Sequence, residues 1–105
     1  MPTVIRQSFT RTDTSVIYPW DPASPHYTEC TESYEAHNNY IQSTFGVTIE
    51  PWVEVSDLEG YQDYVFATDQ LFVEYINTYY NSNLYGEKSV PDVAGLSRST
   101  TVTRD

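Results

Sequence analysis

The segment VTIEPWVEVSDLEGYQDYVFAT, residues 47–68, decides the fold because two runs of alternating side chains flank a turn in it. The first run has four aliphatic side chains on one side: Val47, Ile49, Val53 and Val55. This period of two predicts a strand, residues 57–60 predict a hairpin turn, and residues 61–68 predict a second, antiparallel strand. Pro51 cannot donate to a backbone ladder, so we expect the first strand at a sheet edge or with a bulge.

A helix is predicted before this hairpin. Ser24 followed by Pro25 is typical of a helix start, because Ser caps free N–H groups and Pro fits the first turn. Apolar and aromatic side chains then recur at spacings of three and four and end at Gly46, a favourable C-terminal residue. The stripe consists of Tyr27, Cys30, Tyr34, His37, Ile41 and Phe45.

A second helix is predicted after the hairpin. Thr68 is a suitable N-cap, and Asp69 is favourably placed in the first turn. The helix carries a broad apolar stripe of Leu71, Phe72, Tyr75, Ile76, Tyr79 and Tyr80. Stop signals follow at Asn81, Asn83 and Gly86.

The remaining segments complete the order of elements. Residues 3–9 alternate and are rich in strand-forming side chains, which predicts a first strand. Three prolines make residues 19–24 a loop. The Thr-rich residues 97–103 form either a last edge strand or a disordered tail. The order β-α-β-β-α-(β) predicts an α+β fold of the ferredoxin-like type, an antiparallel sheet with two helices on one face.

The 105 residues predict one domain, residues 1–105, with residues 87–105 as an extended or partly disordered tail. The start of the chain has no signal-peptide pattern, and no apolar run is long enough to span a membrane. We therefore expect a soluble, cytosolic protein. A single Cys excludes an internal disulfide framework.

Charge is distributed unevenly, with 15 Asp and Glu against five Lys and Arg. No basic residue lies between Arg11 and Lys88, whereas 13 carboxylates do. Nucleic acids and anionic membranes both require clustered cations, so neither is an expected partner. The acidic surface includes Glu29, Glu32, Glu35, Glu50, Glu54 and Asp63. It either keeps the protein soluble or mimics nucleic acid.

The predicted hairpin register has two consequences. If Asp57 pairs with Gly60, Glu54 lies opposite Asp63, a like-charge pair that is either solvated or bridged by a cation. The same register predicts an apolar strip of Trp52, Val65 and Ala67 on the sheet face that the helices leave open. Such a strip needs a cover. A second subunit is the favoured cover, and the loop around Trp20 is the alternative.

Catalytic and metal sites are not expected. His26, Cys30 and His37 share a helix face, but seven residues of helix separate Cys30 from His37 by about 10 Å. That distance excludes both a three-ligand zinc site and a thiol–imidazole pair. The sequence contains no calcium loop, phosphate-binding Gly loop or dinucleotide motif, so we expect no metal and no cofactor.

At the level of topology, residues 3–85 resemble the small dimeric α+β barrel proteins, whose ferredoxin-like protomers pack sheet to sheet. The composition resembles that of small accessory proteins of tailed bacteriophages. Together these resemblances imply a non-enzymatic interaction protein that forms a homo-oligomer and contacts another protein, as a virion component or as an assembly or host-interaction factor. Two alternatives remain, an acidic nucleic-acid mimic and a small cofactor-independent enzyme with a Tyr, His or Trp in a cavity between helices and sheet.

Overall fold

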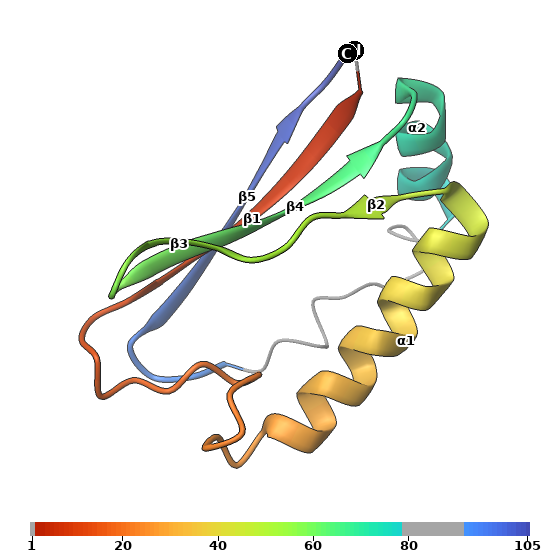
Figure 1. Cartoon of the computed structure of the whole chain (residues 1–105). Helices are drawn as coiled ribbons and strands as arrows, with labels where there is room; N and C mark the ends of the chain where they lie inside the picture. The colour runs from red at the N-terminus through yellow and green to blue at the C-terminus, as the bar shows by residue number, and fades with distance from the viewer. Residues whose placement is uncertain (1, 79–91) are drawn as a thin grey trace.

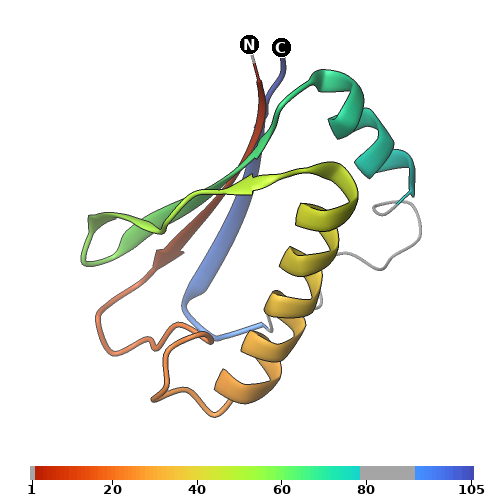
Figure 2. The same ribbon diagram turned by 45° about the vertical axis from the view of Figure 1, so that its right-hand side comes forward.

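The computed structural model describes residues 2–78 and 92–105, which form an α+β structure (Figure 1). Within these residues, an antiparallel sheet of five strands carries two helices on one face (Figures 1 and 2). In chain order the elements are β1 (Thr3–Arg11), α1 (Tyr27–Phe45), β2 (Thr48–Ile49), β3 (Val53–Ser56), β4 (Glu59–Phe66), α2 (Asp69–Thr78) and β5 (Leu96–Thr103). The predicted α+β class is confirmed.

The sheet has the strand order β2-β4-β1-β5, and β3 also pairs with β4. Strands β1 and β4 form its centre, where Thr3 lies opposite Phe66 and Thr10 opposite Glu59. Strand β5 pairs with β1 along its whole length. Residues 97–103, for which the sequence left a strand and a disordered tail open, therefore form an edge strand.

The predicted strand over residues 47–55 is broken into β2 and β3. Pro51 lies in the break, where a residue without an N–H group costs no ladder hydrogen bond. A second irregularity, between Glu54 and Ser56, shifts the hairpin register. Glu54 consequently lies opposite Gly60, so the predicted Glu54–Asp63 pair is wrong.

Asp63 instead lies directly opposite Arg6 of β1. The Arg6 guanidinium donates two hydrogen bonds to the Asp63 carboxylate, at 2.8 and 2.9 Å. The same guanidinium lies 3.8 Å from the centre of the Tyr61 ring. An ion pair and a cation–π contact thus occupy the place where the sequence predicted charge repulsion.

The indole of Trp52 packs directly on the backbone of Gly60. A Cβ atom built on Gly60 would lie 2.0 Å from the indole ring, closer than any real contact. The missing side chain of Gly60 is therefore what lets Trp52 lie flat on β4, on the side of the sheet that faces the helices. The predicted position of Trp52 on the open face is wrong, because the break at Pro51 and the bulge change the register by which that position was assigned.

Helix α1 ends as predicted and begins later than predicted. Gly46 has φ +63°, the left-handed conformation that closes a helix, and its N–H donates to Gln42. At the other end, Ser24 precedes the helix and its hydroxyl accepts from the N–H of His26 in a local turn. The N-cap position is His26, which makes no side-chain cap bond, so the assignment of the cap to Ser24 is wrong.

Helix α2 begins as predicted, because Thr68 Oγ1 accepts a hydrogen bond from the N–H of Leu71 at 3.3 Å. Asp69 in its first turn bonds Arg104, beyond β5, at 2.6 and 2.9 Å, and also accepts from Thr3. The predicted stop signals of this helix lie outside the described residues, as do Tyr79 and Tyr80. Neither described helix is long and apolar enough to cross a membrane.

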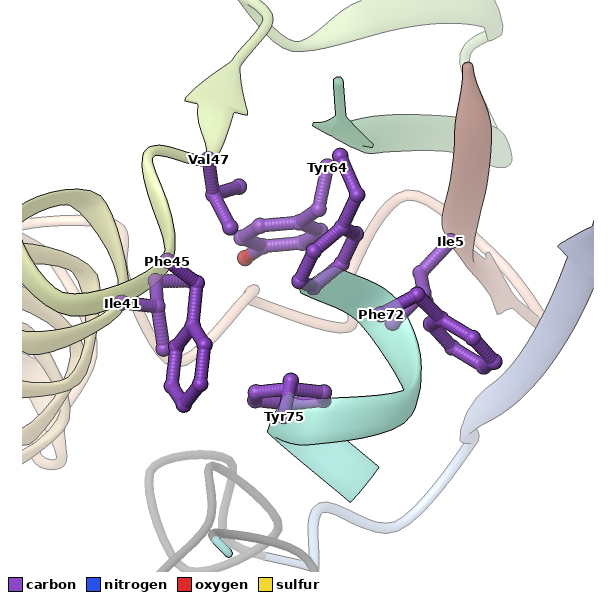
Figure 3. Packing of buried hydrophobic residues seen from close by; sticks show 8 residues of the cluster. Ile5, Ile41, Phe45, Val47, Tyr64, Phe72 and Tyr75 are labelled. Carbon is purple, nitrogen blue, oxygen red and sulfur yellow. The ribbon is translucent and has the colours of Figure 1, made fainter. Parts of the chain in front are cut away.

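The core lies where α2 and the C-terminal end of α1 meet the sheet (Figure 3). Phe66 of β4 is fully buried, and its ring meets those of Phe72 and Tyr75 at centroid distances of 5.6 and 5.3 Å. Tyr75 in turn makes an edge contact with Phe45. The whole cluster is Ile5, Ile41, Phe45, Val47, Tyr64, Phe66, Phe72 and Tyr75.

The open face of the sheet is more polar than predicted. Alternation along the strands places Val4, Arg6, Ser8 and Thr10 of β1 and Tyr61, Asp63 and Val65 of β4 on this face. Val65 lies there as expected, opposite Val4, whereas Ala67 follows the end of β4. Without Trp52 the predicted apolar strip is not formed, so this face gives no argument for a covering subunit.

Candidate functional site

Four aromatic rings gather at the end of the sheet farthest from the core. Phe9 of β1, Tyr18 and Trp20 of the following loop, and Trp52 between β2 and β3 have ring centroids 4.8–6.0 Å apart. Tyr18 and Trp20 are stacked at 9°. The loop residue Trp20 thus covers the helix-facing side of the sheet. The predicted alternative, in which the loop around Trp20 covers the open face, is wrong.

Arg11 holds the loop in this position. Its guanidinium donates to the carbonyl oxygens of Asp57 at 2.8 Å and Val16 at 2.9 Å, and lies 4.8 Å from the centre of the Tyr18 ring. One side chain therefore links the turn between β3 and β4 to the loop that carries Tyr18. The contact also ties Arg11 to the Tyr18 ring, which stacks on Trp20.

A cavity of about 270 Å³ lies between these rings and the N-terminal half of α1. Helix α1 forms one wall of the cavity. The side chains on this wall are spaced by four and then three residues, so they share one helix face: Cys30, Tyr34 and His37. Strands β1 and β4 contribute the opposite wall. The described lining is Gln7, Phe9, Trp20, Cys30, Thr31, Tyr34, His37, Trp52, Gln62 and Tyr64.

A second cavity of about 400 Å³ continues toward the core. It shares Gln7, His37 and Tyr64 with the first, and its other described walls include Ile41, Phe72 and Val102. The two cavities thus adjoin along the middle of α1. The C-terminal end of α1 packs on β2 and α2, whereas the N-terminal half of α1 faces the first cavity.

Polar atoms in the first cavity are arranged along β4. The Tyr64 hydroxyl hydrogen-bonds the Tyr34 hydroxyl at 3.0 Å and Gln62 Oε1 at 3.3 Å. Gln62 Nε2 donates to the carbonyl oxygen of Glu50, which fixes the orientation of that amide. Gln7, which also lines the cavity, makes no side-chain hydrogen bond within residues 2–78 and 92–105, so its amide can bond a ligand.

The described lining carries no formal charge near neutral pH. It includes no Asp, Glu, Lys or Arg. Burial lowers the pKa of His37, which favours the neutral imidazole. Burial also raises the pKa of the Cys30 thiol and, more strongly, of the Tyr64 hydroxyl, so both remain protonated.

The predicted site residues are dispersed. Trp20 and Trp52 come together in the cavity wall, whereas Val65 and Ala67 lie elsewhere. Glu29, Glu32 and Glu35 are exposed on α1, and Glu50 and Glu54 are exposed near the broken edge strand. No three side chains of the His, Cys, Asp and Glu types meet as metal ligands in the described part of the chain.

Comparisons with known proteins add little. No family model matches the sequence, and no curated protein matches it significantly. Among solved structures, a structural-genomics protein named YJCS is similar at a TM-score of 0.45 and 8% identity, over 94% of this chain and 97% of that chain. Likeness at this level supports no inference about the function of this chain.

Proposed function

We propose that this protein binds a small, uncharged, largely aromatic molecule in the cavity between α1 and the sheet. The observation that carries the proposal is the convergence of aromatic rings from three separate segments on a hollow space with an uncharged lining. Apolar cavities with a few fixed polar groups are the usual form of small-molecule sites. The cavity volume of about 270 Å³ lies just below the roughly 300–1,000 Å³ that is usual for small-molecule sites, which suits a molecule of one or two rings.

The two tryptophans provide a direct test. They are the only Trp residues of the chain, and both line the cavity. A neutral two-ring probe such as 2-naphthol should therefore change their emission in a saturable way. Emission that varies only in proportion to probe concentration, with no heat of binding in calorimetry, would contradict the proposal.

A pair of matched variants locates the binding site. Thr31 lines the cavity and Thr28 lies exposed one turn earlier on the same helix. Thr31→Phe fills the space and should abolish probe binding, whereas Thr28→Phe should leave it unchanged. Both variants should melt within a few degrees of the parent protein. Equal binding by the two variants would place the probe elsewhere.

We also propose that the sheet has the ferredoxin-like topology predicted from the sequence. The order β2-β4-β1-β5 supports it if β2 and β3 are counted as two halves of one broken edge strand. In that topology the sheet is built from two β-α-β units whose strands alternate, and both helices cover the same face. A ligand would then lie between that face and the helices. An experimental structure would test this assignment by the pairing of β5 with β1.

The enzyme alternative shares the same cavity, where Tyr34, His37 and Tyr64 stand around the hollow space. Incubation of bound 2-naphthol with the protein in air, followed by mass spectrometry, separates binding from turnover. An unchanged probe supports a binding protein, and an oxygenated product supports the enzyme. The phage-type interaction protein and the nucleic-acid mimic stay predictions from composition and charge.

A further inference from the structure

The two cavities between the helices and the sheet meet at three shared side chains. One each comes from β1, α1 and β4: Gln7, His37 and Tyr64. The first cavity has a volume of about 270 Å³ and the second about 400 Å³. A ligand that fills both is therefore elongated, and its middle lies against these three side chains.

The walls of the two cavities differ in chemistry. Aromatic rings and amides surround the first cavity, among them Phe9, Trp20 and Trp52. Beyond the shared side chains, the described wall of the second cavity is hydrocarbon apart from two hydroxyl groups (Figure 3). Its members are Ile5, Ile41, Phe66, Phe72, Tyr75, Ile76, Thr100 and Val102. An aromatic ring therefore suits the first cavity, and a hydrocarbon chain would bury apolar surface in the second.

Gln7 supplies a polar contact at the junction of the cavities. Its side chain lines both cavities and makes no hydrogen bond within residues 2–78 and 92–105. The amide of Gln62, by contrast, already bonds Tyr64 and the carbonyl oxygen of Glu50. Nε2 of Gln7 is thus a donor for a ligand oxygen at the point where a ring and a chain would meet. A carbonyl group between ring and chain meets this requirement.

Electrostatics favour an uncharged ligand. Neither described lining includes an Asp, Glu, Lys or Arg. Arg104 lies 5.3 Å from the centre of the Phe72 ring, but its guanidinium is already paired with Asp69 at 2.6 and 2.9 Å. A carboxylate would lose its hydration without gaining a cation, and the formal charge of -10 on the chain adds repulsion.

We propose that the two cavities together bind a neutral aryl alkyl ketone. Its ring lies in the first cavity, its carbonyl oxygen accepts a hydrogen bond from Gln7, and its hydrocarbon chain lies in the second cavity. Trp20 and Trp52 contact the ring, and Val102, which pairs with Ile5 across the ladder, contacts the chain. This ligand class rests on the proposed function, because it extends the same aromatic site.

Calorimetry with acetophenone, butyrophenone and hexanophenone tests the ligand class. Each added CH₂ group should tighten binding about threefold to fourfold until the second cavity is full. Hexanophenone should displace 2-naphthol, and hexanoate should not bind. A 2-naphthol complex without any effect of chain length, or without displacement by hexanophenone, would overturn the ketone site alone. Absence of binding by both compounds would overturn the proposed function as well.

Matched variants on β5 locate the chain. Val102 lines the second cavity, whereas the neighbouring Thr101 pairs with Arg6 and points to the open face of the sheet. Val102→Trp occupies part of the second cavity, and should remove most of the gain in affinity from acetophenone to hexanophenone without weakening acetophenone. Thr101→Trp should keep the gain. Equal gains in the two variants would place the chain elsewhere.

Gln7→Leu tests the polar contact. The variant should bind hexanophenone about fivefold to tenfold more weakly, and should bind hexylbenzene, which has a CH₂ group in place of the carbonyl, as the wild type does. Equal losses for the two ligands would contradict the hydrogen bond. Nuclear Overhauser effects in the wild-type complex keep the orientation testable without any variant. The terminal methyl group of hexanophenone should lie near Val102 and its ring near Trp52, and the reverse orientation would overturn the proposal.

Discussion

The two ends of the layer between helices and sheet differ in how deeply their aromatic rings are buried, although each end borders a cavity. At the closed end, Ile41 and Phe45 of α1 meet the core around Phe66, which has no exposed surface. At the open end, Cys30, Tyr34 and His37 of the same helix face a cavity, and Trp52 across from them is 36% exposed. One helix thus contributes to the core at its C-terminal end and to a cavity wall at its N-terminal end.

The largest expected effect comes from removing a ring at the closed end. Phe66→Ala should lower the free energy of unfolding by about 3–5 kcal/mol, because the ring is fully buried against Phe72 and Tyr75 and its removal takes away those contacts. Tyr34→Ala, at the open end, should cost less than about 1 kcal/mol, since its ring already borders free space. Urea unfolding of both variants measures the difference. Equal losses would show that the two ends are packed alike.

The sequence predicted the closed end well and the open end poorly. Ile41, Phe45, Phe72 and Tyr75 were assigned to apolar stripes, and the structure buries all four. The stripe of α1 held a further signal, because it passes from Ile41 and Phe45 to the more polar Tyr34 and His37 toward its start. That change in composition marks the point at which α1 leaves the main core cluster, although Cys30 nearer its start is also buried.

The position of Trp52 could not be predicted by alternation alone. A period of two holds only while pairing is continuous, and Pro51 together with the bulge after Glu54 breaks it twice. Counted back from the turn, the bulge moves Glu54 and the residues before it, including Trp52, by one position relative to β4. The contact of Arg11 with the distant Tyr18 loop was likewise invisible, because it depends on tertiary structure and leaves no local pattern.

A second prediction separates steric from conformational roles of glycine at the two ends of the layer. Gly60→Ala should displace the Trp52 indole, cost about 1–3 kcal/mol of stability and shift the tryptophan emission. Gly46→Ala has free space around its Cβ but a φ of +63°, so it should cost about 1 kcal/mol through backbone strain alone. Its emission spectrum should match that of the wild type. A shifted spectrum in both variants would mean that Trp52 is not held by Gly60.

The smallest expected effect concerns His37, which lies where the two cavities adjoin. Burial lowers the pKa of His37 below the unfolded value of 6.5, so the unfolded chain binds the proton more tightly. The contribution of the neutral imidazole is therefore fully present above about pH 6.5, and is lost as the pH falls through the folded pKa. Each unit by which the folded pKa of His37 lies below the unfolded pKa corresponds to about 1.4 kcal/mol in the free energy of unfolding.

Unfolding experiments between pH 7.5 and about pH 5 test this dependence, since the ion pair with Arg104 keeps the pKa of Asp69 below its usual 3.8 and removes that group from the window. The wild type should lose stability across this range, and His37→Gln should lose less. His26→Gln, changed at the start of α1 outside the cavity lining, should follow the wild type. If His37→Gln follows it too, the junction of the cavities is wet enough to accept a charge, and the closed packing ends nearer to Ile41.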